Sequence, residues 1–586
     1  MSDRVRSRWV LAALLLFSAG IFLTGITWGF PSRAVDPYLF GTHAVWTGQE
    51  IAQLAGDRSP DGRVGADVDV NPLAQRTAPV LLNETDQQRA EIVRRYRLYT
   101  AQPDEMITMM ALASMSPARR DFDPKLYQYG GMWIYPVGAL IKVFANPRAD
   151  QTYYLDYPEA FARFYLVARL YVVAFALLGT WAVFWIARRL SGGNVIVASA
   201  ATLCYALMPV VVNMAHEAKP HLPGAALVLL AVIAGTKYVE SGRKRWWVLA
   251  GALCGAAAGM VLSAVLGVLI VPAMVLFRKE SWVQRLVIAA AALVIAADVY
   301  AMSNPYVLKH LLGDRTVLLS NLKNSRAMYQ APASARGMLN AVRLIIEGAS
   351  PLVAFAGAVT AILVIRRRSA AGWMLGIVGC LVLVQFFLLA TDKPGEYGRF
   401  ALLPNIGLCI AAALGIGTIA RRPVFRIPLL AVLVISTAFF GAGYVWHFIR
   451  DSQPMSSRLI AAKRLAEKAS EGASHLEITA EPAPYSMPPV DLFSWQITLL
   501  PRGQQVTADA DVALQMVDTI PRHVSNTIDI DGVHFAHGYW FRPRLEIRTD
   551  QTVWYSFGTP ISWASKPIEV FIRQDLSSRS SNGRRP

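Results

Sequence analysis

Apolar runs of membrane-spanning length recur along this 586-residue chain and leave few folds open to it. A helix needs roughly 20 consecutive apolar residues to cross the hydrocarbon core of a bilayer. The first run covers residues 9–30. Ten further runs follow, and we predict about eleven transmembrane helices from them, at residues 165–187, 194–213, 223–239, 246–261, 263–277, 286–303, 348–365, 372–390, 401–420 and 427–447. The stretch from Trp246 to Phe277 is too long for one helix and short for two, so we interpret it as a tight hairpin.

Composition agrees with a polytopic membrane protein. Hydrophobic residues make up 54% of the chain and charged residues 17%, against about 25% charged residues in soluble domains. The formal net charge of +17 does not indicate a nucleic-acid partner, because no nucleic-acid-binding motif is present. The four cysteines all lie in apolar runs, which favours packing over disulfides or metal ligands: Cys204, Cys254, Cys380 and Cys409.

Basic residues orient the predicted spans. The first run is longer than the apolar core of a signal peptide and lacks a clear cleavage site, so we expect an uncleaved span with a cytoplasmic N-terminus. Arginine and lysine then cluster in alternate loops, as they do on the cytoplasmic side of membrane proteins. Residues 31–161 become the first extracytoplasmic loop. The predicted outer segment 304–346 is an exception, because it carries six basic residues: Lys309, Arg315, Lys323, Arg326, Arg336 and Arg343.

The chain divides into a transmembrane module, residues 1–450, and a polar region that cannot span the membrane. That region opens with an amphipathic stretch, SSRLIAAKRLAEKAS, followed by short strand-like runs broken by Pro and Gly. We predict a small extracytoplasmic α/β domain over residues 451–575 and a disordered tail over 576–586. The fold class is therefore mainly α, with a long first loop and a small C-terminal α/β domain.

Two adjacent acids open an apolar stretch in the first predicted loop. Asp104 and Glu105 follow Pro103, which suits the first turn of a helix, where acids complement the helix dipole. They can therefore be simple helix-start residues. Neighbours on a helix point about 100° apart, so the two acids of a functional pair would have different roles. One carboxylate would act on a substrate, and the other would orient it or hold a metal.

Further polar residues gather in two predicted outer turns. The turn NMAHEAKPHLPG carries four of them: His216, Glu217, Lys219 and His221. They either meet lipid headgroups or project toward the cavity of Asp104; a His-Glu-His set can bind zinc, but this spacing is no established zinc motif. In DKPGEYGRFALLPN, Lys393 and Arg399 are donors suited to phosphate. Arg169, just inside the second span, reads most simply as a snorkelling arginine.

Four stretches resemble the GT-C superfamily of membrane glycosyltransferases, in particular the family 39-like enzymes related to protein O-mannosyltransferases and to the aminoarabinose transferase of lipid A. They are QPDEMITMMALA, DFDPKLYQYGGMWIYPVGALI, ARLYVVAFALLGTWAVFWIARRLSGG and EYGRFALLPNIGL, and the likeness covers residues 95–410 loosely. The chain departs from the pattern in a longer first loop and in Tyr129-Gly130-Gly131, where relatives carry Tyr-Pro-Pro. The turn holding Glu217 often carries Asp in relatives, which leaves open whether Glu217 is a second functional acid.

The resemblance implies a transferase that moves a sugar from a polyprenyl-phosphate donor to an acceptor hydroxyl on a lipid, glycan or protein at the extracytoplasmic face, with inversion. Asp104 would be the base and Glu105 its support, with Tyr127 and Tyr129 near the sugar. A divalent metal is a further option. The basic segment 304–346 would meet either the donor phosphate or anionic lipid headgroups. The alternatives are a transporter or flippase for lipid-linked sugars, and a non-catalytic sensor or assembly protein. The transferase hypothesis requires that Asp104 meet the 216–221 turn in one cleft.

Overall fold

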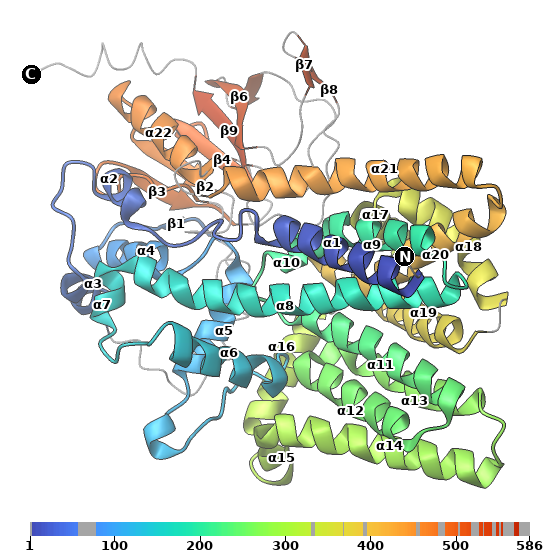
Figure 1. The fold of residues 1–586 in the computed structure, drawn as a ribbon. Helices are drawn as coiled ribbons and strands as arrows, with labels where there is room; N and C mark the ends of the chain where they lie inside the picture. Colours follow the sequence, from blue (N-terminus) through green and yellow to red (C-terminus); the bar gives the residue numbers. More distant parts are fainter. Residues whose placement is uncertain are drawn as a thin grey trace, which may run out of the picture.

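The computed structural model describes most of the chain, and its helices form a bundle with a polar cap at one end (Figure 1). The described residues are 3–56, 78–329, 334–366, 369–390, 395–452, 457–478, 487–501, 504, 506–516, 527–530, 533–541, 547–549, 552–554 and 568–573. The predicted C-terminal tail, 576–586, lies outside them. The protein is mainly helical and is an integral membrane protein.

Seven helices in the described residues are long and apolar enough to cross a membrane, and two bent helix pairs raise the number to nine. The seven helices are α1 (Asp3–Leu23), α8 (Pro158–Leu190), α11 (His221–Ser241), α14 (Trp282–Ser303), α19 (Ala370–Ala390), α20 (Leu402–Ile419) and α21 (Pro423–Arg450). The bent pairs are α9 (Val195–Leu207) with α10 (Pro209–Ala215), and α17 (Ala335–Ala349) with α18 (Pro351–Arg366). In each pair a proline is the first residue of the second helix. Because proline has no backbone NH, it cannot donate a hydrogen bond to the preceding turn, and the first helix does not continue through it.

The predicted count of eleven spans is not confirmed, and the difference lies in the predicted hairpin. Its first arm is α12 (Lys244–Met260), with 17 residues. Its second arm is a 3-10 segment, η3 (Leu262–Leu269), that continues into the short helix α13 (Ile270–Leu276). The tighter 3-10 winding and the extended backbone at Val261 allow the chain to reverse here, so both arms stay short.

The first loop is a folded layer at one end of the bundle (Figure 1). Its elements are η1 (Arg33–Val35), α2 (Asp36–Phe40), α3 (Gly48–Ala55), β1 (Val80–Leu81), α4 (Asp86–Leu98), α5 (Pro103–Ala113), η2 (Pro117–Arg119), α6 (Gly131–Phe144) and α7 (Thr152–Asp156). Thr47 and Thr85 form complete capping boxes at the starts of α3 and α4. We call the end of the bundle that carries residues 31–157 the loop face.

The C-terminal region packs onto the same layer. Helix α22 (Ser457–Ser470) precedes the strands, which are β2 (His475–Ile478), β3 (Gln496–Leu499), β4 (Val512–Met516), β5 (Thr527–Ile530), β6 (Val533–Phe541), β7 (Ile547–Thr549), β8 (Thr552–Trp554) and β9 (Ile568–Arg573). Seven strands form one sheet in the order β1-β3-β2-β4-β9-β6-β5, in which β3, β2 and β4 run parallel; β7 and β8 pair separately. Strand β1 comes from the first loop and pairs antiparallel with β3, so both regions lie at the loop face.

Candidate functional site

Asp104 lies where three separate segments meet at the loop face. It is in the first turn of α5, whose N-cap Gln102 accepts a hydrogen bond from the Asp104 backbone NH. Its Oδ2 atom lies 2.7 Å from Nζ of Lys219, in the turn between α10 and α11. The same oxygen lies 3.4 Å from Nη1 of Arg399, in η4 (Gly395–Ala401). The structure therefore brings Asp104 together with the 216–221 turn and with Arg399.

The charge of Asp104 is strongly stabilised. Burial raises the pKa of the Asp104 carboxyl, but Lys219 and Arg399 outweigh burial and hold that pKa well below its usual range. The side chain is still 27% exposed, whereas that of Lys219 is 2% exposed. The site is thus a partly exposed carboxylate that contacts two largely buried cations.

Glu217 is a second carboxylate on the same lysine, in a different environment. Its Oε2 atom lies 3.1 Å from Nζ of Lys219, and Asn213 donates a hydrogen bond to its Oε1. The side chain is fully buried, and burial raises the pKa of Glu217 despite the nearby lysine. Lys219 therefore joins two carboxyls whose pKa values are displaced in opposite directions, an arrangement common where acids take different roles.

Glu105 points away from Asp104 into a fully buried ion pair. Arg169 of α8 binds it through two parallel contacts, Nε to Oε1 at 2.8 Å and Nη2 to Oε2 at 2.7 Å. Thr100 Oγ1 and the backbone NH of Ala218 also donate to it, each at 2.6 Å. Arg169 in turn donates to the carbonyl oxygens of Ile26 and Trp28 after α1. This network fixes α5, the end of α1, α8 and the 216–220 turn against one another.

The two histidines of the turn occupy different surroundings. His216 is buried and stacks on Phe448 of α21, with ring centroids 4.2 Å apart. Its ring nitrogens lie 2.7 Å from the carbonyl oxygen of Val212 and 2.8 Å from that of Thr24, and burial lowers the pKa of His216 to about 4. It lies among packed helices. His221 instead lies edge-on to Phe400 and Tyr129, at the site.

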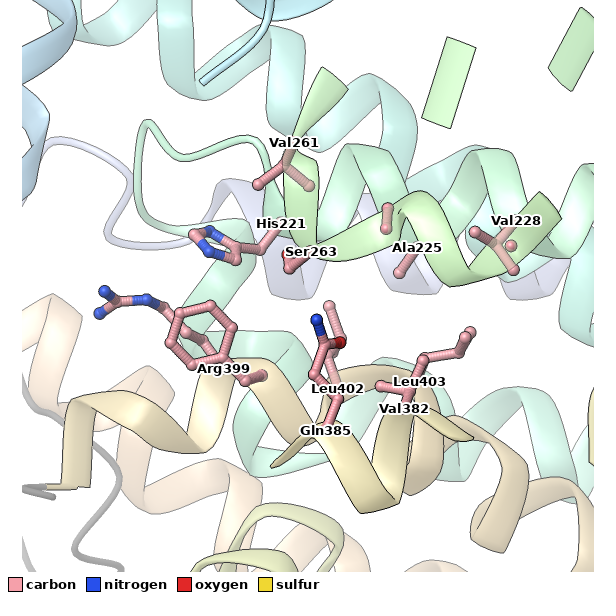
Figure 2. Close-up of a pocket in the computed structure, with 13 residues that line it drawn as sticks. His221, Ala225, Val228, Val261, Ser263, Val382, Gln385, Arg399, Leu402 and Leu403 are labelled. Atoms are coloured by element: carbon pink, nitrogen blue, oxygen red, sulfur yellow. The ribbon is translucent and has the colours of Figure 1, made fainter. Parts of the chain in front are cut away.

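An apolar pocket opens beside these residues, between α11, η3, α19 and α20 (Figure 2). His221 and Arg399 lie together at one end of it, and Val228 and Leu403 lie further along. Nδ1 of His221 is buried without a hydrogen-bond partner in the described part of the chain. The remaining lining residues are Ala225, Val261, Ser263, Ala264, Gly267, Val382, Gln385, Phe400 and Leu402. The pocket thus joins a polar, cationic end to an apolar interior.

The remaining predicted site residues are Tyr127, Tyr129 and Lys393, and of these Tyr129 contacts His221 of the site. Tyr127 donates a hydrogen bond to Oδ1 of Asp123, and its ring contacts His310, so it belongs to a junction between the first loop and α15 (Pro305–Leu312). Tyr129 is buried and forms an isolated β-bridge with Val261. Lys393 lies outside the described residues.

The surroundings of Asp104 do not fit a divalent metal. Lys219 and Arg399 already place two positive charges on its carboxylate, and these would repel a cation. Across the described residues, no group of three or more His, Cys, Asp or Glu side chains is arranged to hold a metal ion.

The sequence interpretation missed the role of Arg169. It is fully buried and contacts Glu105 in two places, so it is not a snorkelling residue at the membrane surface. The signal that could have found it is the pairing of one acid in the first loop with one cation inside a span, because an intramembrane charge requires a partner. The pocket residues Ser263 and Gln385 gave no signal of this kind.

Comparison with protein families confirms the resemblance to GT-C membrane glycosyltransferases. Residues 163–319, from α8 to the start of α16 (Thr316–Tyr329), match the model of a family described as dolichyl-phosphate-mannose-protein mannosyltransferase. Asp104 and Arg399 lie outside the matched segment, whereas Lys219 and His221 lie within it. No curated protein sequence matches the chain significantly.

Three solved structures show remote similarity over parts of this chain. ArnT from Cupriavidus metallidurans bound to undecaprenyl phosphate is 15% identical, with 67% of this chain and 84% of that chain covered and a TM-score of 0.38. The oligosaccharyltransferase AglB from Archaeoglobus fulgidus, in complex with an inhibitory peptide and a dolichol-phosphate, is 11% identical, with 80% of this chain and 69% of that chain covered and a TM-score of 0.36. The S. cerevisiae protein O-mannosyltransferase Pmt1-Pmt2 complex bound to the sugar donor is 13% identical, with 52% of this chain and 38% of that chain covered and a TM-score of 0.26. TM-scores this low do not assign a fold or a function.

Proposed function

We propose that this protein is a glycosyltransferase that moves a sugar from a polyprenyl-phosphate donor to an acceptor hydroxyl at the extracytoplasmic face of the membrane. One observation carries the proposal: the Asp104 carboxylate contacts Lys219 and Arg399, and Arg399 also lines the polar end of an apolar pocket. The family matched by residues 163–319 is named for a donor of this class. The acceptor is a lipid, a glycan or a protein. The loop face, with the C-terminal sheet, is then extracytoplasmic.

The pocket suits a donor with a charged head and an apolar tail. Its interior is lined by aliphatic side chains such as Val228, Val382 and Leu403, which favour an isoprenoid chain over water. Arg399 lies at the polar end, where the phosphate of such a donor would bind. Lys219 is close to Arg399, because both side chains contact the same carboxylate oxygen of Asp104. Cations held in place before the reaction stabilise negative charge that develops on a leaving phosphate.

The proposed reaction is a single displacement. The acceptor oxygen forms a bond to the anomeric carbon as the bond from that carbon to the phosphate oxygen breaks. The acceptor proton passes to a carboxylate oxygen of Asp104, and polyprenyl phosphate leaves with the bonding electrons. Attack opposite the leaving group inverts the anomeric carbon.

Without donor, Asp104 is a weak base, because Lys219 and Arg399 lower its pKa. A donor phosphate competes for the same two cations. Its arrival would weaken their hold on Asp104 and raise the proton affinity of the carboxylate when the acceptor must be deprotonated. Glu105 acts as a positioning residue, because its buried pair with Arg169 fixes the first turn of α5.

The test is transfer by an Asp104→Asn variant in membranes supplied with a polyprenyl-phosphate sugar and an acceptor extract. Loss of a general base lowers the rate by about 100-fold or more. Asp86→Asn is the matched control, because Asp86 is also a first-turn acid of a loop helix and is largely exposed. Its activity should equal that of the wild type. Lys219 keeps its contact with Glu217 in the Asp104 variant, so folding is expected to persist.

Two results would contradict the proposal. Wild-type rates in a folded Asp104→Asn protein would remove the assigned base. Movement of the intact lipid-linked sugar across the bilayer, with no transfer by the wild type, would favour a flippase instead.

A further inference from the structure

Two helices after the seventh predicted span expose both leucines and cations. Helix α15 follows α14 after Asn304, and α16 follows α15. None of the residues of α15 is buried. The exposed leucines are Leu308, Leu311 and Leu312 on α15 and Leu319 and Leu322 on α16. We call these five residues the leucine stripe.

Within each of the two helices the exposed leucines recur at helical spacing. Leu308, Leu311 and Leu312 are three and four positions apart, so they share one side of α15. Leu319 and Leu322 repeat the spacing on α16. Exposure is greatest at Leu312, which is 85% exposed. Exposed leucines gathered on one side of a helix indicate a contact with a membrane or a protein.

Three exposed cations flank the leucine stripe: Lys309, Arg315 and Lys323. Within the described residues no carboxylate forms an ion pair with any of them. The nearby acid Asp314 accepts hydrogen bonds from Thr316 at the start of α16. The three side chains are exposed, although Lys309 Nζ lies 5.2 Å from the ring centroid of Tyr306 and Arg315 Nε donates a hydrogen bond to the carbonyl oxygen of Leu311.

The opposite sides of both helices are fixed to the first loop. His310 lies 2.7 Å from Oδ2 of Asp123, and Tyr306 accepts a hydrogen bond from the backbone NH of Phe122. On α16, Asn321 donates to the carbonyl oxygen of Lys125. These contacts hold α15 and α16 at the loop face, and they also fix which sides of the helices remain outward.

We propose that the leucine stripe and its three flanking cations form an interfacial platform that binds anionic phospholipid headgroups in the leaflet at the loop face. The leucines enter the acyl boundary, and the cations bind the phosphates just above it. An amphipathic helix with flanking lysine or arginine residues binds membranes in this way. The basic segment that departs from the charge bias of the other loops thus has a partner on its own side of the membrane. The inference stands independently of the proposed transfer reaction.

The test uses the full chain in phosphatidylcholine nanodiscs with added phosphatidylglycerol, and bound phosphatidylglycerol is counted by native mass spectrometry. The variant Lys309→Gln, Arg315→Gln, Lys323→Gln removes the three charges. Each basic residue near an anionic surface contributes about fivefold to binding, so the triple variant should lose at least tenfold in affinity. Added salt should weaken wild-type binding and affect the variant less.

Two matched triple variants separate the platform from general charge effects. Lys463→Gln, Arg464→Gln, Lys468→Gln removes the same charge from α22, which lies far from α15 (Figure 1). It should bind as the wild type does. Lys309→Arg, Arg315→Lys, Lys323→Arg keeps the charges and should also bind normally.

Three outcomes would overturn the platform. One is phosphatidylglycerol binding that is unchanged when the three charges are removed. Another is an equal loss in the α22 variant. The third is a loss of added polyprenyl phosphate with phosphatidylglycerol binding intact, which would reassign these cations to the donor.

Discussion

Asp104 and Glu105 show how adjacent residues of one type acquire different roles. The helix start turns them about 100° apart. Asp104 remains partly exposed beside Lys219 and Arg399, whereas Glu105 is enclosed by Arg169. The sequence predicts the divergence, since any helix imposes it. It does not reveal which acid pairs with which cation, because that depends on the distant partners Arg169 and Lys219.

Glu105→Gln should destabilise the protein strongly. It leaves the buried Arg169 guanidinium without its carboxylate, and breaking one side of a buried pair costs about 3–5 kcal/mol. Thermal unfolding in detergent measures the effect. Glu91→Gln is the control, because Glu91 pairs with Arg94 and Arg95 near the surface of α4, where such pairs contribute about 1 kcal/mol or less. Equal melting temperatures for both variants would contradict the assigned positioning role.

The pH profile of transfer should report the two states of Asp104. With its pKa depressed in the free protein, the carboxylate stays ionised, and its ion pairs stay stabilising, until the pH falls well below the ordinary carboxyl value of about 4. The acid limb of kcat/KM, which reports the free enzyme, should therefore lie at low pH. If the donor phosphate draws Lys219 and Arg399 away, the acid limb of kcat should lie at higher pH. Coincident limbs would argue against competition for the cations.

At the scale of elements, α12 and α14 approach closely because small residues face one another. Gly251 and Gly255 of α12 lie against the backbone of Ala292 and Ala296 of α14, so a Cβ at either glycine would overlap a carbonyl oxygen. Stripes of small residues allow such contact between membrane helices, where dispersion and close packing provide the attraction.

Gly255→Val should therefore push α14 away and lower stability by about 1–3 kcal/mol, the usual cost of overpacking. Gly379→Val is the matched control, because a Cβ at Gly379 on α19 meets nothing within 4 Å. Thermal unfolding of the two purified variants compares them directly. A control that is destabilised as much as Gly255→Val would show that the cost arises from valine in a helix and not from the contact.

Local sequence patterns predicted individual helices and strands, but not which distant segments pair with one another. Two of the predicted strand-like runs contain β2 and β3, and the stretch SSRLIAAKRLAEKAS contains α22, because alternation and helical spacing are short-range signals. Strand β1 and the hydrogen bonds of Asn83 to Leu492 and Trp495 join residues about 400 positions apart. No pattern within either segment specifies that pairing.

At the scale of the whole molecule, that pairing fixes which regions share a side of the membrane. The first loop supplies β1 to the C-terminal sheet, and through Asp104 it also contacts Lys219 and Arg399 at the ends of the spans. The bundle has its short basic turns at the opposite end, for example the turn with Arg243 between α11 and α12 and Lys244 as the first residue of α12. The sequence predicts this polarity from the charge bias alone.

Cysteine labelling of intact cells tests the polarity. Ala44→Cys in the first loop and Ser470→Cys at the end of α22 are exposed, and both should react with a membrane-impermeant maleimide. Ser241→Cys, at the end of α11, is equally exposed and should react only after the membrane is permeabilised. Cys380 is replaced by alanine in all three, because it is the exposed native cysteine among the described residues. Since β1 and β3 hold the first two positions on one side, opposite labelling of Ala44→Cys and Ser470→Cys would contradict the sheet itself. Labelling of Ser241→Cys alone in intact cells would instead show that the protein has the opposite orientation in the membrane. The proposed transfer would then take place on the cytoplasmic side.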